Sequence, residues 1–445
     1  MNLENIQNNK CKMILQFSIP SIIAMVLTSL ITIADGFFIG NYVGKEGITA
    51  VNLGLPIVYL FLAAGLMISV GGMAIAGMEL GGSNIKKCRD IFNQTMSTVT
   101  VLTVLLSAII WFCLAPMAEI LGADALVGGY FRSYYGILLL ELPIMVINSS
   151  FGMFIRGEGK PQYFMQINIV NVLLNILLDY LFVRFCGWGV KGVALASLIS
   201  VIVTFLFILD FFIRKSKVYK FHRFAFSMTA FRSTILNGSS EFIGEMSMSI
   251  SMFAYNFVIM KYIGVNGVTA FSIVGYISYI FSMIVIGFGQ GASPLISFAY
   301  GAEERCLAAD LRKITSRMVL AVGAGVFLLV LAGSGRYGGL FVRNDVIEGM
   351  VRLGAVIFST SFLFSGINTI ASFYFTSIGR AKESAVISFA RGLVVLLICI
   401  FTLPPLFGMT GVWLVAPVTE VLTLMISVAF IGKNKREVYA ACQSI

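Results

Sequence analysis

The sequence predicts an all-α polytopic membrane protein whose twelve transmembrane helices form two pseudo-symmetric six-helix bundles. Of its 445 residues, 58% are hydrophobic and only 12% are charged, with a mean hydropathy of +0.93. Soluble globular proteins carry about 25% charged residues. Twelve apolar runs are long enough to cross a bilayer, and the second half of the chain repeats glycines of the first half. This composition excludes a soluble enzyme, a disordered chain and a nucleic-acid-binding protein.

Each predicted helix corresponds to one apolar run, because about 20 mostly apolar residues are needed to cross the hydrocarbon layer. The first run follows Lys10 and Lys12 but carries Asp35 and is too long for a signal peptide, so it is expected to be retained. In chain order the runs are 14–39, 52–76, 93–116, 131–154, 162–185, 192–213, 234–260, 268–292, 315–333, 353–377, 384–404 and 411–431.

The basic residues predict how these spans are oriented. With the N-terminus inside, the cytoplasmic segments hold 23 of the 31 Lys and Arg residues, Arg391 among them, and the opposite side holds 8. Cytoplasmic loops carry such an excess of basic residues. Both termini are therefore expected to be cytoplasmic. The net charge of +10 is explained by contact with anionic lipid, without nucleic acid.

An internal repeat relates the two halves. Residues 42–50, YVGKEGITA, match residues 262–270, YIGVNGVTA, at five of nine positions, and the same offset of 220 relates Gly159 to Gly379 and Asn148 to Asn368. Each half holds six spans, an even number, so both halves enter the membrane in the same orientation. Such parallel repeats are typical of transporters, with a substrate site expected between the halves.

The repeat also predicts the domain organisation. An N-terminal six-helix lobe comprises residues 1–213, a cytoplasmic linker residues 214–233, and a C-terminal six-helix lobe residues 234–445. The linker holds the single histidine, His222, which we interpret as a solvated linker residue.

Acidic residues inside the predicted spans are candidate functional groups, because a charge at a helix centre costs about 3 kcal/mol on insertion scales. In the fifth span Asn168, Asn171, Asn175 and Asp179 form one stripe of a helix. Such an oxygen-rich stripe could bind a proton or a hard cation such as Na⁺, or its asparagines could bond neighbouring helices. Asp35, at the end of the first span, could face water or could face Asp179. Two close carboxylates in a poorly solvated cavity do not both ionise, so the pair would hold a proton.

The second half carries acids at different positions. Glu241 and Glu245 lie one turn apart in the seventh span, Met252 continues the same helix face, and Glu420 lies in the twelfth span. These groups could attract a cationic substrate, although Glu241 is also within reach of Arg232. The acids do not follow the repeat, since Asp35 pairs with Tyr255 and Asp179 with Cys399. We therefore expect the N-lobe to handle a coupling ion and the C-lobe or the interface to handle substrate. The role of Glu141, in the fourth span, stays undecided.

Four segments carry a resemblance to a known family: IADGFFIGNYVGKEGITAVN (33–52), RGEGKPQYFMQ (156–166), NVLLNILLDYLFV (171–183) and GVKGVALAS (189–197). Together with the duplicated twelve-span plan, they make residues 14–431 resemble the bacterial MATE (multidrug and toxic compound extrusion) family. The resemblance implies a V-shaped pair of six-helix bundles that export cationic amphiphilic compounds in exchange for H⁺ or Na⁺. It places the N-lobe cation site at Asp35, Asn175 and Asp179, with Ser197 where the family often has threonine, and Asn148 could join it.

The sequence departs from the family at one place. Members with a Na⁺ site in the C-lobe pair a glutamate of the seventh span with an aspartate of the tenth, but here the tenth span contains Asn368 and no acid. An N-lobe coupling site therefore fits better.

The sequence thus predicts a cation-coupled antiporter of a bacterial inner membrane that works by alternating access as a monomer, without a cofactor other than the coupling ion. No ATPase motif, nucleophile motif or metal-ligand spacing supports an enzyme. The alternative is a lipid-linked oligosaccharide flippase of similar architecture. Because flippases usually place several cations in their cavity and the deep charges here are expected to be acidic, antiport is favoured.

Overall fold

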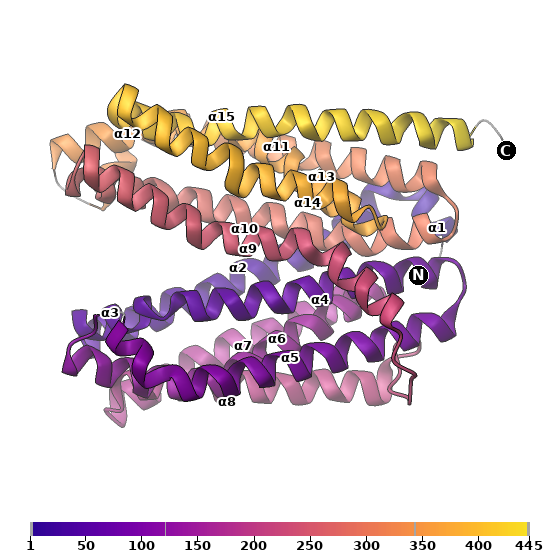
Figure 1. Cartoon of the computed structure of the whole chain (residues 1–445), viewed down its shortest axis with the longest axis horizontal. Coiled ribbons are helices and arrows are strands. Elements are labelled where there is room, and N and C mark those ends of the chain that lie inside the picture. Colours follow the sequence, from indigo (N-terminus) through magenta and orange to yellow (C-terminus); the bar gives the residue numbers. More distant parts are fainter. Residues whose placement is uncertain (1–2, 121, 342–343, 443–445) are drawn as a thin grey trace. The chain divides into compact units, whose positions relative to one another are not determined.

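The computed structural model describes residues 3–120, 122–341 and 344–442, and the described chain is helical throughout, without a strand. Figure 1 shows the helices in chain order. In the first half they are α1 (Leu3–Asn8), α2 (Lys10–Tyr42), α3 (Lys45–Leu53), α4 (Leu55–Gly81), α5 (Ile85–Ile120), α6 (Ala125–Gly157), α7 (Pro161–Asp179) with the π-helical turn η1 (Tyr180–Phe185), and α8 (Gly189–Asp210) with the π-helical turn η2 (Phe211–Lys215).

The second half follows the same plan. Its helices are α9 (Met228–Tyr262), α10 (Val265–Gly301), α11 (Arg305–Tyr337) with the 3-10 turn η3 (Gly338–Leu340), α12 (Asp345–Ser359), α13 (Phe362–Ser377), α14 (Ala381–Phe389) with the π-helical turn η4 (Ala390–Val394), and α15 (Val395–Cys442).

The predicted spans are present in the described chain. Ten helices are long and apolar enough to cross a membrane, and α12 with α13 forms a further span bent by 45°. The last of the ten, residues 381–438, has 58 residues, about twice what a membrane requires. Its backbone reverses at Gly408, where φ is 58° and ψ is −136°, and Figure 1 shows the two parts of α15 running in opposite directions. The helical membrane fold with twelve spans is therefore confirmed.

Backbone geometry repeats between the halves at the offset found in the sequence. Left-handed φ angles occur at Gly44 (99°) and Gly264 (89°), and at Ser83 (62°) and Glu303 (64°), each pair 220 residues apart. Positive φ is uncommon for a residue with a side chain, so its recurrence at Ser83 and Glu303 marks one loop conformation copied twice. The same relation holds for Gly159 with Gly379 and, at an offset of 219, for Gly189 with Gly408.

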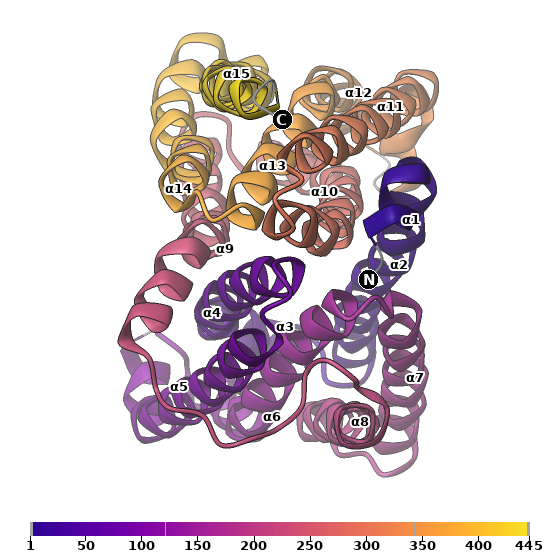
Figure 2. The same cartoon turned by 90° about the vertical axis from the view of Figure 1, so that its right-hand side faces the viewer.

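The first compact unit comprises residues 23–238. Its helices α4, α5, α6 and α8 pack on one another, and Figure 2 views them nearly end-on. At one end of the unit, Phe92 lies among Phe154, Phe212 and Tyr219, with ring centroids 4.9, 5.3 and 5.3 Å away. Because Tyr219 follows the last helix of the half, this aromatic cluster attaches the connecting segment to the bundle.

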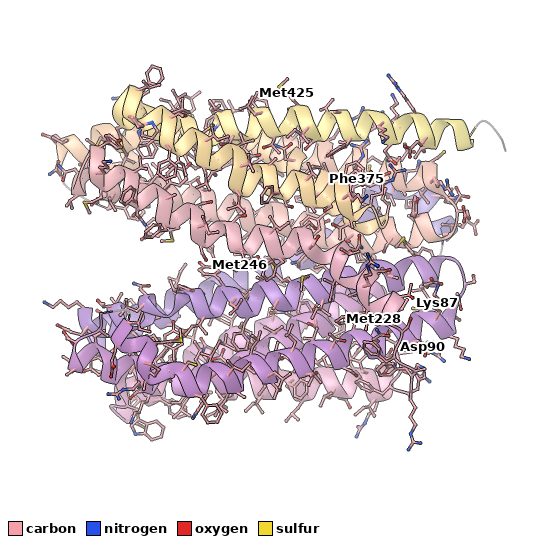
Figure 3. The ribbon with its side chains drawn as sticks, viewed as in Figure 1. Lys87, Asp90, Met228, Met246, Phe375 and Met425 are labelled. Atoms are coloured by element: carbon pink, nitrogen blue, oxygen red, sulfur yellow. The ribbon has the colours of Figure 1, made fainter. Side chains whose placement is uncertain are left out.

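Polar bonds fasten the same connecting segment, residues 216–227, to the first unit. Asn93 Nδ2 donates to the carbonyl oxygen of Lys220 at 2.9 Å, and His222 Nε2 lies 2.7 Å from Asp90 Oδ1. Asp90 is labelled in Figure 3, near one end of the first unit. The Glu158 carboxylate accepts from the backbone N–H of Lys217 at 2.5 Å. His222 is exposed, as expected of a linker residue, and it also has an acidic partner in Asp90.

The second compact unit comprises, of the described residues, 3–22, 239–341 and 344–442. Helices α10, α11, α12, α13 and α15 form its bundle. Trp413 is fully buried, its indole ring is stacked 6.2 Å from Phe271, and it lies against Gly354, where an added Cβ would come within 2.3 Å of the ring. Lys10 pairs with Asp310 at 2.5 Å, which attaches the start of α2 to this unit.

A substitution at Gly238 would test how the start of α9 packs within the first unit. A Cβ at Gly238 would lie 1.7 Å from the carbonyl oxygen of Met67, which is backbone and cannot rotate away. We expect Gly238→Ala to lower the melting temperature of the purified protein clearly, because overpacking costs about 1–3 kcal/mol or more. The matched control on the same helix is Gly244→Ala, since Gly244 has nothing within 4 Å of an added Cβ. Equal melting curves for the two variants, measured by size-exclusion chromatography after heating, would contradict this packing.

Candidate functional site

Four of the predicted site residues meet in the first unit, at the end of α7. Asn175 and Asp179 are fully buried there, and Ser197 on α8 is 5% exposed. Asp179 is the last α-helical residue before the π-helical turn η1. Such π turns recur at functional sites because they rotate side chains out of the regular helical register. Here the turn directly follows the buried carboxylate.

The contacts of this site leave several oxygen atoms without a donor. Asn175 Nδ2 donates to Ser197 Oγ at 3.0 Å. The Asp35 carboxyl group, on α2, is close enough to Asp179, Asn175 and Ser197 to interact with all three side chains. Yet Asp35 Oδ1, Asn175 Oδ1 and both carboxylate oxygens of Asp179 are buried without a hydrogen-bond partner in the described chain.

Oxygen atoms arranged in this way can bind a proton or a cation. Buried acceptors without donors cost about 1–3 kcal/mol each, and more when they are charged. A proton on one carboxyl group would supply a donor between Asp35 and Asp179. A Na⁺ ion would use the same oxygens as ligands. The described residues contain no group of three or more His, Cys, Asp or Glu that could hold a metal ion, so any ion here would rely on amide and hydroxyl oxygens as well.

Glu141 and Tyr134 on α6 belong to the same acidic region, which the sequence left undecided for Glu141. Glu141 is 6% exposed, its Oε2 has no partner in the described chain, and it lies within electrostatic range of Asp35. Tyr134 lies within electrostatic range of Asp35, Asp179 and Glu141. The sequence signal for Glu141 was its position inside a span. Its proximity to Asp35 depends on how α6 packs on α2 and could not be read from spacing.

Other polar residues of the first unit make separate contacts. Asn148 Nδ2 donates to the carbonyl oxygen of Val201 at 3.0 Å and to Thr204 Oγ1 at 3.3 Å, so it joins α6 to α8. Within the described chain, neither of these hydrogen bonds connects Asn148 to Asp35 or Asp179. Asn171 has a buried Oδ1 without a partner in the described chain, and Asn168 donates to the carbonyl oxygen of Phe164. The described hydrogen bonds of Asn148 therefore join two helices of the first unit, and its predicted part in the cation site stays a prediction, as does that of Asn171.

The second unit contains a different polar cluster, formed by Asn368, Arg391 and Glu420. Arg391 Nε lies 2.7 Å from Glu420 Oε1, and Asn368 Nδ2 donates to Glu420 Oε2 at 2.8 Å and to the Glu420 carbonyl oxygen at 2.9 Å. Glu420 is thus neutralised by an arginine within the same unit. The expectation that the deep charges are all acidic is wrong, because Arg391, assigned by its charge to the cytoplasmic side, lies within the apolar helical segment 381–438 and reaches Glu420.

The remaining candidates of the second unit do not join this cluster. Glu241 and Glu245 on α9 are half-buried and lie within electrostatic range of each other. No hydrogen bond or ion pair of the described chain connects either acid to Glu420. The side chain of Met252 is 57% exposed. Figure 3 labels Met246, which lies on the same helix α9, and Met425 on α15. Met425 is 67% exposed, as expected of a lipid-facing residue.

The helical plan and this site agree with a known family of membrane transporters. The MatE family model matches residues 20–181 and 242–401, one match in each half of the chain. The protein belongs to the MatE family and is a transporter, not an enzyme.

Individual relatives are distant in sequence and close in fold. The chain is 24% identical over 408 residues to the multidrug export protein MepA of Staphylococcus saprophyticus, covering 90% of this chain and 89% of MepA. It is 25% identical over 403 residues to MepA of Staphylococcus haemolyticus, covering 90% and 88%. Two solved structures share the fold: MATE in complex with MaL6 (TM-score 0.90, 22% identity, 97% of each chain) and an outward-facing multidrug resistance MATE transporter of the MOP superfamily (TM-score 0.89, 23% identity, 97% of this chain and 96% of that chain).

The unpartnered oxygens of Asp179 predict how stability depends on pH. Protonation gives the site a donor between Asp35 and Asp179, so the purified wild-type protein should melt at a higher temperature at about pH 6 than at about pH 8 in Na⁺-free buffer. The stabilisation is expected to be lost as the pH rises and the site deprotonates. Asp179→Asn should remove most of this difference, because the amide donates at both pH values.

The matched control for this measurement is Asp210→Asn. Asp210 lies at the end of α8 and pairs with Arg214 at 3.1 Å near the surface, so its variant should keep the pH difference of the wild type. If Asp179→Asn kept the full difference as well, the carboxyl pair would not be the group that titrates.

Proposed function

We propose that this transporter exports cationic amphiphilic drugs or toxic metabolites, driven by the inward movement of H⁺ or Na⁺ through the site around Asp35 and Asp179. The observation that carries the proposal is the buried carboxyl pair with unpartnered oxygens in a chain of the MatE family. Relatives that match nearly the whole chain are named multidrug export proteins. The substrate class and the coupling ion are part of the proposal.

The mechanism follows from differential affinity. A cation can drive a conformational change only if it binds one state more tightly than the other. A proton or Na⁺ ion entering from outside satisfies the oxygens of Asp35, Asn175 and Asp179, which favours the state in which α2, α7 and α8 close on the ion. Release of the ion to the cytoplasm leaves the carboxylates unpaired again, which favours the opposite state. Substrate moves outward in the same cycle.

A lipid-linked oligosaccharide flippase is not favoured. A flippase needs several unpaired cationic groups to meet a diphosphate. Arg391 is an interior cation of the second unit, but Glu420 already neutralises it. The curated relatives that match 90% of the chain are named as exporters of drugs.

We further propose that the protein works as a monomer in the bacterial plasma membrane with both termini in the cytoplasm. The support for this topology is the excess of Lys and Arg in the segments that it places inside. Ten helices of the described chain are long and apolar enough to cross a membrane, which agrees with a multi-pass protein.

The experiment is dye efflux from efflux-deficient bacteria. Cells that express the wild type should expel ethidium, and an uncoupler should abolish the expulsion if the coupling ion is H⁺. Replacing Na⁺ by K⁺ in the medium should abolish it if the ion is Na⁺. Asp179→Asn should lower the initial efflux rate at least about tenfold, equivalent to about 1.4 kcal/mol, because a neutral amide does not exchange protons and binds Na⁺ less tightly.

Asp210→Asn, expressed to the same level, is expected to transport like the wild type. Asp179→Asn cells that expel the dye at the wild-type rate, with unchanged sensitivity to uncoupler and Na⁺, would exclude this carboxylate as the coupling group. Wild-type cells that expel no cationic dye would contradict the proposed substrate class.

A further inference from the structure

Helix α11 carries two cationic side chains that have no partner within the described chain. Lys313 and Arg317 are exposed, and neither makes an ion pair, a hydrogen bond or a contact with an aromatic ring there. Their neighbour Arg312 differs, because it is half-buried and its guanidinium lies 5.5 Å from the ring centre of Tyr374. Lys313 and Arg317 therefore lie on the outer side of the second unit.

The acid best placed to neutralise Lys313 already has a partner. Asp310 stands three positions before Lys313, a spacing at which side chains on a helix are neighbours. Its carboxylate instead pairs with Lys10 at 2.5 Å. The positive charges of Lys313 and Arg317 are therefore open to an anion from outside the chain.

An exposed apolar stripe continues from these cations along the same face of α11. Leu320, Leu328 and Leu331 are exposed, and they follow Arg317 at spacings of three, eight and three residues, which keep them on one helix face. Only 17% of the most apolar stretch of residues 305–340 is buried, the lowest share among the ten such stretches of the described chain. This face of α11 is therefore in contact with lipid.

The length of the stripe matches one lipid molecule. From Arg317 to Leu328 the helix rises about 17 Å, and one leaflet contributes roughly half of the 30 Å hydrocarbon layer. An acyl chain can therefore lie along Leu320 and Leu328 while the phosphate of the same lipid meets Arg317. Lys313, one turn further toward the start of the helix, is then at the level of the headgroup.

The first half of the chain covers the corresponding place with protein. Asn93 and Ser97 on α5 precede Lys313 and Arg317 by 220 residues. Asn93 is buried, and its Nδ2 donates to the carbonyl oxygen of Lys220. The helical packing shared by the halves therefore needs no cation at this place, because the first half has two neutral residues there. The two cations of α11 indicate a ligand in the second half.

We propose that Lys313 and Arg317 bind the phosphate group of an anionic phospholipid whose acyl chains lie along Leu320 and Leu328. The guanidinium can donate two parallel hydrogen bonds to phosphate oxygens, and the ammonium adds a second positive charge. Because no acid balances these charges, a lipid with a net negative charge is favoured over a zwitterionic lipid. The inference goes beyond the proposed export function and does not depend on the drug or on the coupling ion.

The test uses a phospholipid with a photoreactive diazirine on its acyl chain in two forms: phosphatidylglycerol, which is anionic, and phosphatidylcholine, which is zwitterionic. The full-length protein in neutral detergent is illuminated with each lipid, and mass spectrometry measures the labelling of residues 318–336. The wild type should be labelled more strongly by the anionic lipid. Lys313→Gln/Arg317→Gln should lower the ratio of anionic to zwitterionic labelling at least about tenfold, because both charges at the headgroup are lost.

Two further variants control for net charge and for folding. Lys86→Gln/Lys220→Gln removes two exposed cations of the first unit and changes the net charge equally, so it should keep the wild-type ratio. Lys313→Arg/Arg317→Lys exchanges the two cations and leaves both charges in place, so its ratio should stay close to that of the wild type.

The outcomes that would overturn the site are distinct. An unchanged ratio in Lys313→Gln/Arg317→Gln would do so, and an equal fall in Lys86→Gln/Lys220→Gln would assign the preference to net charge alone. Equal labelling of the wild type by both lipids would remove the preference for an anionic headgroup. Soluble glycerol phosphate in excess should not reduce the labelling, because it has no acyl chain; if it abolished the labelling, the cations would bind free phosphate and the lipid assignment would be wrong. None of these results involves transport, so a failure here leaves the proposed function standing.

Discussion

The cost of an unpaired charge in a low-dielectric interior is the constraint on which the rest of this structure depends. The helical scaffold solves the problem for the backbone, because each span satisfies its own N–H and C=O groups. A charged side chain inside the helical bundle needs a partner of its own. Arg391 and Glu420 neutralise each other within the second unit, whereas Asp35 and Asp179 in the first unit have acceptors only. The charged pair of the second unit therefore has its partner within the chain, whereas the carboxyl pair of the first unit has none within the described residues.

The internal repeat explains how the two halves share one helical scaffold and still carry different buried charges. The left-handed turns at Gly44 and Gly264, and at Ser83 and Glu303, fix where spans end and are shared by the halves. Close packing positions are shared too: a Cβ at Gly47 would meet Ile39 and Val43, and one at Gly267 would meet Ile259 and Ile263. The acidic side chains are not shared, because Asp35 corresponds to Tyr255 and Asp179 to Cys399.

The sequence predicted what depends on local pattern. Apolar length and charge breaks gave the spans, and the offset of 220 gave the repeat, because both follow from composition along one segment. The grouping of Asp35 with Asn175, Asp179 and Ser197 came from motif resemblance, and the structure brings these residues together. The ion pair of Arg391 could not be predicted. It depends on how η4 packs beside α15, and an arginine near a span end is usually a cytoplasmic charge. The role of Glu141 stayed undecided for the same reason, since Asp35, which lies within electrostatic range of it, is more than a hundred residues away in sequence.

The segment 216–227 connects the two repeated halves of the chain, and its hydrogen bonds show which half holds it. All of its described anchors, among them Asp90, Asn93 and Glu158, belong to the first unit. The junction between the halves is therefore bonded to the first unit over its described residues. An insertion within residues 216–227 would therefore have to leave these bonds in place, whereas a longer junction in itself would not disturb the first unit.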